Sequence, residues 1–109
     1  MYKSKKIKID TYPIDIRIVI TNDLDKFKKK TGLTATSNNA CWYDSEKSRI
    51  TLQFHKETTF GIIAHECFHA TNFIFKKIGA YSDVDNDENQ AYLLEYLCDN
   101  VISFMNKKD

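Results

Sequence analysis

Residues 59–79 read TFGIIAHECFHATNFIFKKIG, and the way this stretch folds decides the architecture of the chain. The stretch predicts a long helix, because Thr58 or Thr59 is a good N-terminal cap and the apolar run ends near Ile78. Gly79 then fits the left-handed position that follows many helices. At about 3.6 residues per turn the segment is apolar almost all round, which predicts a central, buried helix. Its only polar strip consists of His65, His69, Asn72 and Lys76.

Alternating polar and apolar residues predict strands earlier in the chain. The segments concerned are residues 5–9, residues 14–20, Ala40–Tyr43 and Arg49–His55. In the second of them, one face carries Ile14, Ile16, Ile18 and Ile20. Pro13 lies just before this strand, where its missing N–H is tolerated. The last two segments flank a turn near residues 44–47 and predict a hairpin.

Two further helices are expected. A short helix over Leu24–Thr31 has Asn22 or Asp23 as its cap. A second long helix starts near Asp85 or Asn86 and reaches about residue 105, with an apolar stripe of Ala91, Leu94, Cys98, Val101, Ile102 and Met105. Strands first and long helices last predict an α+β fold, in which a small, mainly antiparallel sheet packs on the buried helix and on the C-terminal helix.

Composition limits the functional classes. The 109 residues predict one domain, residues 1–109, and a net charge of +1 argues against a dedicated nucleic-acid binder. No apolar run is long enough for a membrane helix, and Met1–Ile9 lacks the apolar stretch of a secretory signal. Cys41, Cys67 and Cys98 are widely spaced, which predicts reduced thiols and a cytoplasmic location rather than a disulfide framework.

The chemistry-bearing feature is the H-E-x-x-H motif from His65 to His69. Histidines four residues apart share a helix face, so the two imidazoles can converge on one metal ion. Glu66 points to a neighbouring face, outside the ligand set, where it can take a proton from a metal-bound water. The alternative is a pair of core histidines whose polar atoms are satisfied by nearby carboxylates. Cys67 falls on another face and is expected in the core.

A catalytic zinc site needs a third protein ligand and one open position. Glu88 is the candidate, because it is the first glutamate after the motif, nineteen positions beyond His69, at the start of the last helix. Asp85 and Glu88 also have capping-box spacing, so Glu88 could instead satisfy backbone N–H groups. Glu95, two turns further on, either orients a ligand imidazole or is an exposed helix charge, and Asp99 projects nearby.

Of three further candidates, two have a simpler explanation. Tyr92, four residues after Glu88, is a candidate oxyanion donor among six tyrosines. His55 fits a surface histidine at a strand end. The acidic run that contains Asp83, Asp85 and Asp87 lacks the glycine and distant glutamate of a calcium loop, so a solvated turn is expected.

The chain from about Arg49 to Asp99 resembles a minimal gluzincin-type zinc metallopeptidase of the zincin group, in which a glutamate on a following helix completes H-E-x-x-H. The run Glu88–Tyr92, with its E-x-x-A pattern, is similar to ImmA-type peptidases of mobile elements and to small phage-encoded metallopeptidases. The resemblance implies that Zn²⁺ is held by His65, His69 and Glu88. It also implies hydrolysis of peptide bonds with Glu66 as general base.

The resemblance further implies that Arg49–His55 is the edge strand that pairs with an extended substrate. The expected partner is a peptide or protein substrate, with no nucleic acid and no membrane; the sequence does not predict the oligomeric state. Two rival hypotheses stay open. One is a catalytically silent, metal-stabilised binding module of phage or mobile-element origin, and the other is a structural domain whose histidines bind no metal.

Overall fold

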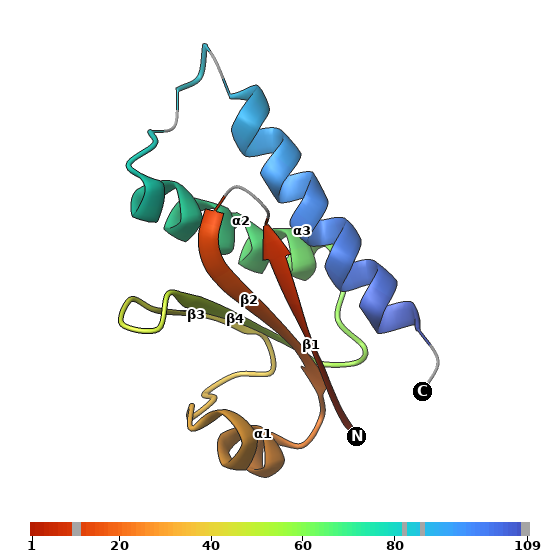
Figure 1. Ribbon diagram of the computed structural model, residues 1–109. Helices are drawn as coiled ribbons and strands as arrows, with labels where there is room; N and C mark the ends of the chain where they lie inside the picture. Colours follow the sequence, from red (N-terminus) through yellow and green to blue (C-terminus); the bar gives the residue numbers. More distant parts are fainter. Residues whose placement is uncertain (10–11, 82, 86, 108–109) are drawn as a thin grey trace.

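The computed structural model describes residues 1–9, 12–81, 83–85 and 87–107. Its elements, in chain order, are β1 (Tyr2–Ile9), β2 (Tyr12–Thr21), α1 (Leu24–Thr31), β3 (Ala40–Asp44), β4 (Arg49–Phe54), α2 (Phe60–Ile78) and α3 (Glu88–Asn106) (Figure 1). The α+β prediction is therefore confirmed. None of the helices in the described ranges has the length and apolar character needed to cross a bilayer.

The sheet is mixed, with the strand order β1-β2-β4-β3. β1 and β2 are antiparallel, β2 and β4 are parallel, and β3 and β4 form the predicted antiparallel hairpin. The prediction that Arg49–His55 forms the edge is wrong, because β4 lies between β2 and β3. Side chains on both faces of β4, from Ile50 to Phe54, are buried, which is typical of an interior strand. The edge strand on this side is β3.

The strand face and the helix caps predicted in the first half of the chain are confirmed, but the predicted place of Pro13 is wrong. The four isoleucines of β2 are buried on one face of the sheet. Asp23 caps α1 by accepting a hydrogen bond from the Lys26 amide, and Gly32 ends the helix at φ 78°. Pro13 lies inside β2 rather than before it, at a bulge in the pairing with β1 where it has no partner, so its missing N–H breaks no ladder bond.

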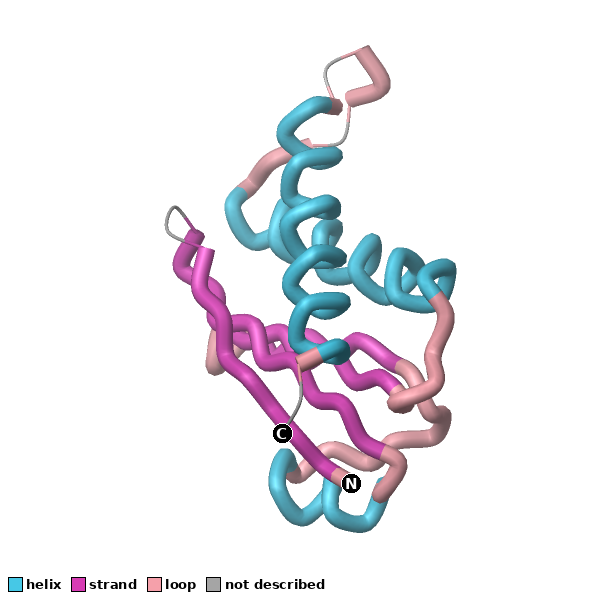
Figure 2. Tube along the Cα trace, turned by 90° about the vertical axis from the view of Figure 1, so that its right-hand side faces the viewer, coloured by secondary structure: helices cyan, strands magenta, loops and turns pink. Residues whose placement is uncertain are grey.

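Two layers of secondary structure form the core. α2 and α3 lie on the same side of the sheet and cover its isoleucine-rich face (Figure 2). α1 packs on the opposite side, where the Phe27 ring contacts Trp42 of β3 at a centroid distance of 5.3 Å. Successive residues of a strand face opposite sides. Accordingly, Tyr43 stacks on Phe73 of α2 instead, at 5.2 Å.

The ends of α2 match the prediction, but its surroundings do not. Thr59 caps the helix by accepting from the Ile62 amide, and Gly79 follows at φ 76°. The expectation of a helix buried all round is wrong: Phe60 is 72% exposed and Phe68 is 47% exposed. The physical reason is that the sheet and α3 cover one side of α2, and no other described element covers the opposite side.

α3 begins later than predicted, at Glu88 rather than near Asp85; Asn86, the other predicted start, lies outside the described residues. Its buried positions are Leu93, Leu97 and Val101. The buried face of α3 is therefore rotated about the helix axis relative to the predicted stripe. Ala91, which the periodicity placed in the stripe, is exposed. At the C-terminal end of α3, the Phe104 and Lys107 carbonyl oxygens each accept a hydrogen bond from Lys3 Nζ of β1, both at 2.8 Å.

Two alanine substitutions, one inside α2 and one just after its last residue, test where the helix ends. Gly79→Ala should lower the free energy of unfolding by about 1 kcal/mol, because φ 76° strains an L residue while its Cβ would meet nothing within 4 Å. Gly61→Ala, the matched control at an ordinary φ, should raise it by up to about 0.5–1 kcal/mol. Urea unfolding of both variants measures the two shifts. Shifts of the same sign would contradict the assigned end of α2.

Candidate metal centre

His65, Glu66 and His69 of α2 form a group of potential metal ligands. The ligand atoms that they offer all lie within 4.8 Å of one another. The two imidazole rings meet edge to face, with a centroid distance of 4.8 Å and an interplanar angle of 86°. Across the described part of the chain, this is the one place where three or more His, Cys, Asp or Glu side chains come so close.

The position of the group follows from the way α2 packs. Ile63, Cys67 and Ile74 lie on the buried side of the helix. Residues three or four apart share a face, so the two histidines lie together on the side turned away from the core. Both imidazoles are exposed, and Glu66 is half-buried. The alternative of two core histidines satisfied by carboxylates is therefore wrong, since neither ring is in the core.

Glu66 lies on the flank of α2 that faces the edge strand β3. Burial raises the pKa of the Cys41 thiol of β3 to about 12, and the nearby Glu66 carboxylate contributes to the rise. The Tyr43–Phe73 stack joins the same two elements about two turns of α2 further on. β3 thus runs beside the motif, in the place that the sequence analysis had given to β4. No pattern in the sequence identifies it, because Thr51 and Gln53 alternate with the apolar residues of β4, as in a strand with one exposed face.

The cysteines lie outside the close group of potential metal ligands. All three are free, as predicted, and Cys67 is buried in the core. A hydrogen bond with Cys98, and then burial, raise the pKa of Cys67, whereas the same hydrogen bond lowers the pKa of Cys98. A thiol binds metals as the thiolate. Cys41 and Cys67, the two cysteines beside Glu66, therefore stay protonated near neutral pH.

Glu88 is exposed, is the first residue of α3, and is not part of the close group. The capping box with Asp85 is not formed, because Asp87 occupies the N-cap position and makes no side-chain cap hydrogen bond. The first turn of α3 does reach the histidine face of α2. There, Gln90 Nε2 donates to Asn72 Oδ1 at 3.0 Å, and Asn72 lies about one turn beyond His69.

The remaining candidates are not brought to the group. Tyr92 is 63% exposed and lines a groove with residues of β1 and β2, to which no motif residue contributes. Glu95 and Asp99 are exposed on α3, so their roles stay predictions. His55 follows β4, and its Nδ1 accepts the Glu57 amide at 3.1 Å. The described acidic residues before α3 are exposed, as predicted for a solvated turn.

No protein-family model, curated protein or solved structure matches the chain. Its function therefore has to be inferred from the residues and the geometry of this group.

The paired histidines predict metal binding that can be measured directly. The purified chain should bind close to one Zn²⁺, as a site with two imidazoles and a carboxylate does. His65→Ala and His69→Ala should each weaken binding by more than the roughly 10–100-fold that loss of an outer-shell partner costs. His55→Ala is the matched control and should bind as tightly as the wild type. Calorimetric zinc titration of the four proteins measures this; equal affinity in all of them would exclude the site.

Proposed function

We propose that this protein is a zinc-dependent metallopeptidase. His65 and His69 hold the metal, Glu88 is the third protein ligand and Glu66 is the general base. The observation that carries the proposal is the convergence of the motif side chains, whose ligand atoms lie within 4.8 Å of one another on an exposed helix face. Neither composition nor fold class alone would favour a peptidase.

The donor set fits zinc. The imidazoles of His65 and His69 with the proposed Glu88 carboxylate would be a familiar zinc ligand set that leaves a position for water. Both histidines are exposed, so that side of α2 is accessible. When bound, Zn²⁺ would lower the pKa of water to near 7 and polarise a carbonyl group. The half-buried Glu66 supports this assignment, because a carboxylate held beside the ligands can act on water without itself being a ligand.

Glu88 is proposed as the third ligand because of what its helix contacts. The hydrogen bond between Gln90 and Asn72 ties the first turn of α3 to the histidine face of α2. A Glu88 carboxylate ligand from that turn would leave Glu66 free for proton transfer.

Glu66 takes a proton from the attacking water and returns it to the departing amine nitrogen, as a general base and then a general acid. Within the described part of the chain, β3 pairs only with β4, so its other side is a place for an extended peptide to add by main-chain hydrogen bonds. Ile62 and Phe68, partly exposed near the histidines, are apolar contacts for a substrate side chain. A peptide substrate is thus more compatible with this surface than a small polar one.

The role of Glu66 is tested by Glu66→Gln, which keeps the side-chain shape and removes the base. Peptide hydrolysis should fall by at least about 10²-fold, while zinc affinity stays within a few fold of the wild type. Glu57→Gln, at an exposed position just before α2, should leave both unchanged. Turnover on a broad peptide library, with metal content measured in parallel, makes the comparison. Equal turnover in Glu66→Gln and the wild type would refute the mechanism. Zinc without turnover in any of the proteins would favour the catalytically silent binding module.

The ligand role of Glu88 is tested by its effect on affinity. Glu88→Gln should weaken zinc binding by on the order of 10²-fold, more than an outer-shell change. In the absence of metal it should lower stability by less than about 1 kcal/mol, because it removes one exposed charge from the start of α3. Glu95→Gln, another exposed glutamate of α3, is the control. If Glu66→Gln lost the metal and Glu88→Gln kept it, the two glutamates would have to exchange roles.

A further inference from the structure

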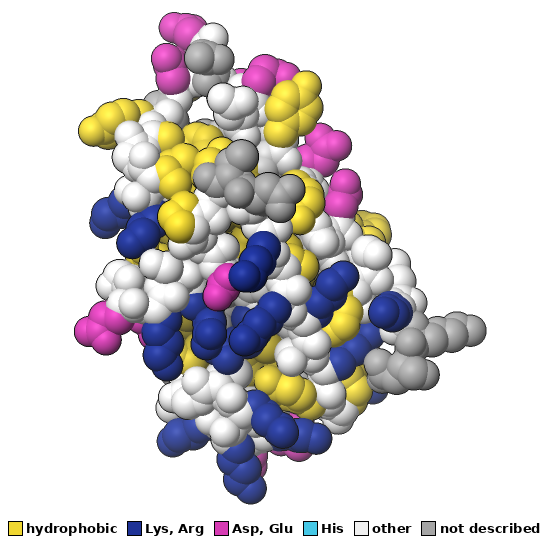
Figure 3. Space-filling view, viewed as in Figure 1, with side chains coloured by type: hydrophobic (Ala, Val, Ile, Leu, Met, Phe, Trp, Pro, Cys, Tyr) yellow, Lys and Arg dark blue, Asp and Glu magenta, His cyan; other side chains and the backbone are white. Residues whose placement is uncertain are grey.

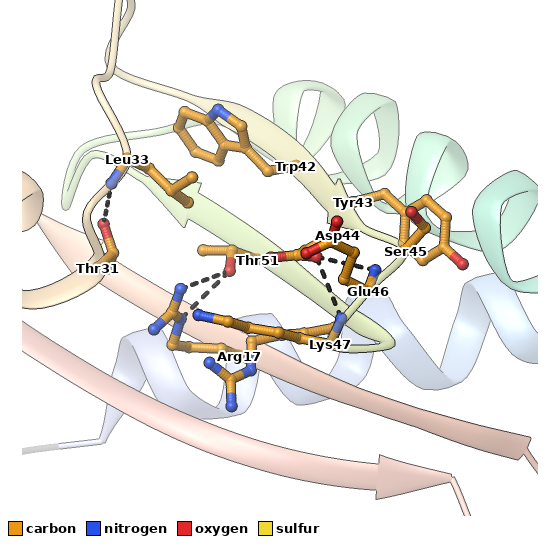
Figure 4. Close-up of a pocket in the computed structure, with 11 residues that line it drawn as sticks. Arg17, Thr31, Leu33, Trp42, Tyr43, Asp44, Ser45, Glu46, Lys47 and Thr51 are labelled. Carbon is orange, nitrogen blue, oxygen red and sulfur yellow. Dashed lines mark hydrogen bonds between the residues drawn. The ribbon is translucent and has the colours of Figure 1, made fainter.

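The face of the sheet turned away from α2 carries a pocket of about 360 Å³. Side chains from β2, β3, β4 and the β3–β4 turn line it, and Figure 4 shows Thr51 at its centre with Trp42 on one side and Arg17 and Lys47 on the other. Arg49 and Leu33 also line the pocket. No residue of the metal group lines this pocket.

Strand register brings these side chains together. Arg17 of β2 is paired with Thr51 of β4, and Thr51 is paired with Trp42 of β3. These three positions therefore form one row across the outer face of the sheet. Arg49 lies two residues before Thr51, on the same face. Contact with Phe27 of α1 fixes the indole ring, so the pocket has one rigid aromatic wall.

The pocket holds unbalanced positive charge. Arg17 donates from Nε and Nη2 to the neutral Thr51 hydroxyl, at 3.2 and 3.0 Å. Burial, and then the positive charge of Arg49, lower the pKa of Arg17. The Nε of Arg49 is itself buried and has no hydrogen-bond partner among the described residues. Lysine and arginine side chains gather over the same strands in the space-filling view of Figure 3.

Two carboxylates at the rim do not neutralise this charge. Asp44 Oδ1 accepts the backbone amides of Glu46 and Lys47, at 3.0 and 3.1 Å, so it serves the β3–β4 turn. Glu46 belongs to the turn itself and is exposed. The turn therefore holds Lys47 at the mouth of the pocket. Asp15, the register partner of Arg49 on β2, does not line the pocket.

We propose that this pocket binds the phosphoryl group of a small phosphate monoester. Two guanidinium forks and an ammonium group match the charge and the several oxygens of a phosphate, and the unused Nε of Arg49 is a donor ready for one of them. A bound dianion would also relieve the repulsion between Arg17 and Arg49. Trp42 and Leu33 leave an apolar side for the organic part of the ligand.

Trp42 is the only tryptophan of the chain and lines the pocket, so its fluorescence reports binding. Titration with phenyl phosphate at constant ionic strength should give a saturable change, and inorganic phosphate should compete for the same site with weaker affinity. Arg49→Gln should weaken the affinity for phenyl phosphate and for inorganic phosphate at least tenfold. Arg49→Lys should fall between Arg49→Gln and the wild type, because it keeps the charge and loses the fork. Lys28→Gln, an exposed cation of α1, should bind like the wild type.

The same titrations can overturn the proposal. Circular dichroism first confirms that each variant is folded, and Arg17→Gln replaces Arg49→Gln if the latter is not. Absence of a saturable response to either probe would refute the site. If Lys28→Gln lost as much affinity as Arg49→Gln, general attraction by the positive surface, and not the pocket, would explain the binding. Binding of a single-stranded oligonucleotide in place of phenyl phosphate, with a steep dependence on salt, would assign the face to a polyanion rather than to a monoester.

Discussion

The packing of one side of α2 against the isoleucine-rich face of the sheet is the contact on which the rest of the structure depends. Ile63, Cys67 and Ile74 of the helix belong to one buried cluster with the inner residues of β2 and β4. Burial of each fully buried aliphatic side chain contributes about 1.5–3 kcal/mol to the free energy of unfolding. Rotating α2 to bury its histidines would expose several of them at once. The outward orientation of the H-E-x-x-H motif is therefore a consequence of core packing.

Local features were predictable and long-range ones were not. Thr59 and Gly79 identify the ends of α2 because capping depends on a few adjacent residues. The close group of the motif followed from helical periodicity for the same reason. Strand order did not follow, because alternation assigns a face to Arg49–Phe54 but not its neighbours. The position of Glu88 relative to the histidines depends on how α3 crosses α2, and no short pattern encodes that angle.

β3 is the element that both candidate sites share. Its residues alternate between the two faces, so Cys41 and Tyr43 point toward α2, whereas Trp42 points into the basic pocket. In the sheet formed by the described residues, the strand has a partner on one side only. Its position beside α2 is maintained by the Tyr43–Phe73 stack, and its position beside α1 by Phe27. A single short strand thus lies between the helix that carries the H-E-x-x-H motif on one face and a cluster of cations on the other.

The parallel pairing of β2 with β4 has a consequence for the order of folding. Antiparallel neighbours such as β3 and β4 are joined by a short turn and can pair early. β2 and β4 can pair only after the chain between Thr21 and Arg49 has closed into a loop, and such non-local pairing is slow. We therefore expect the central seam of the sheet to form late. Arg17 and Thr51 lie on opposite sides of that seam, so the basic pocket is assembled only in the last stage of folding.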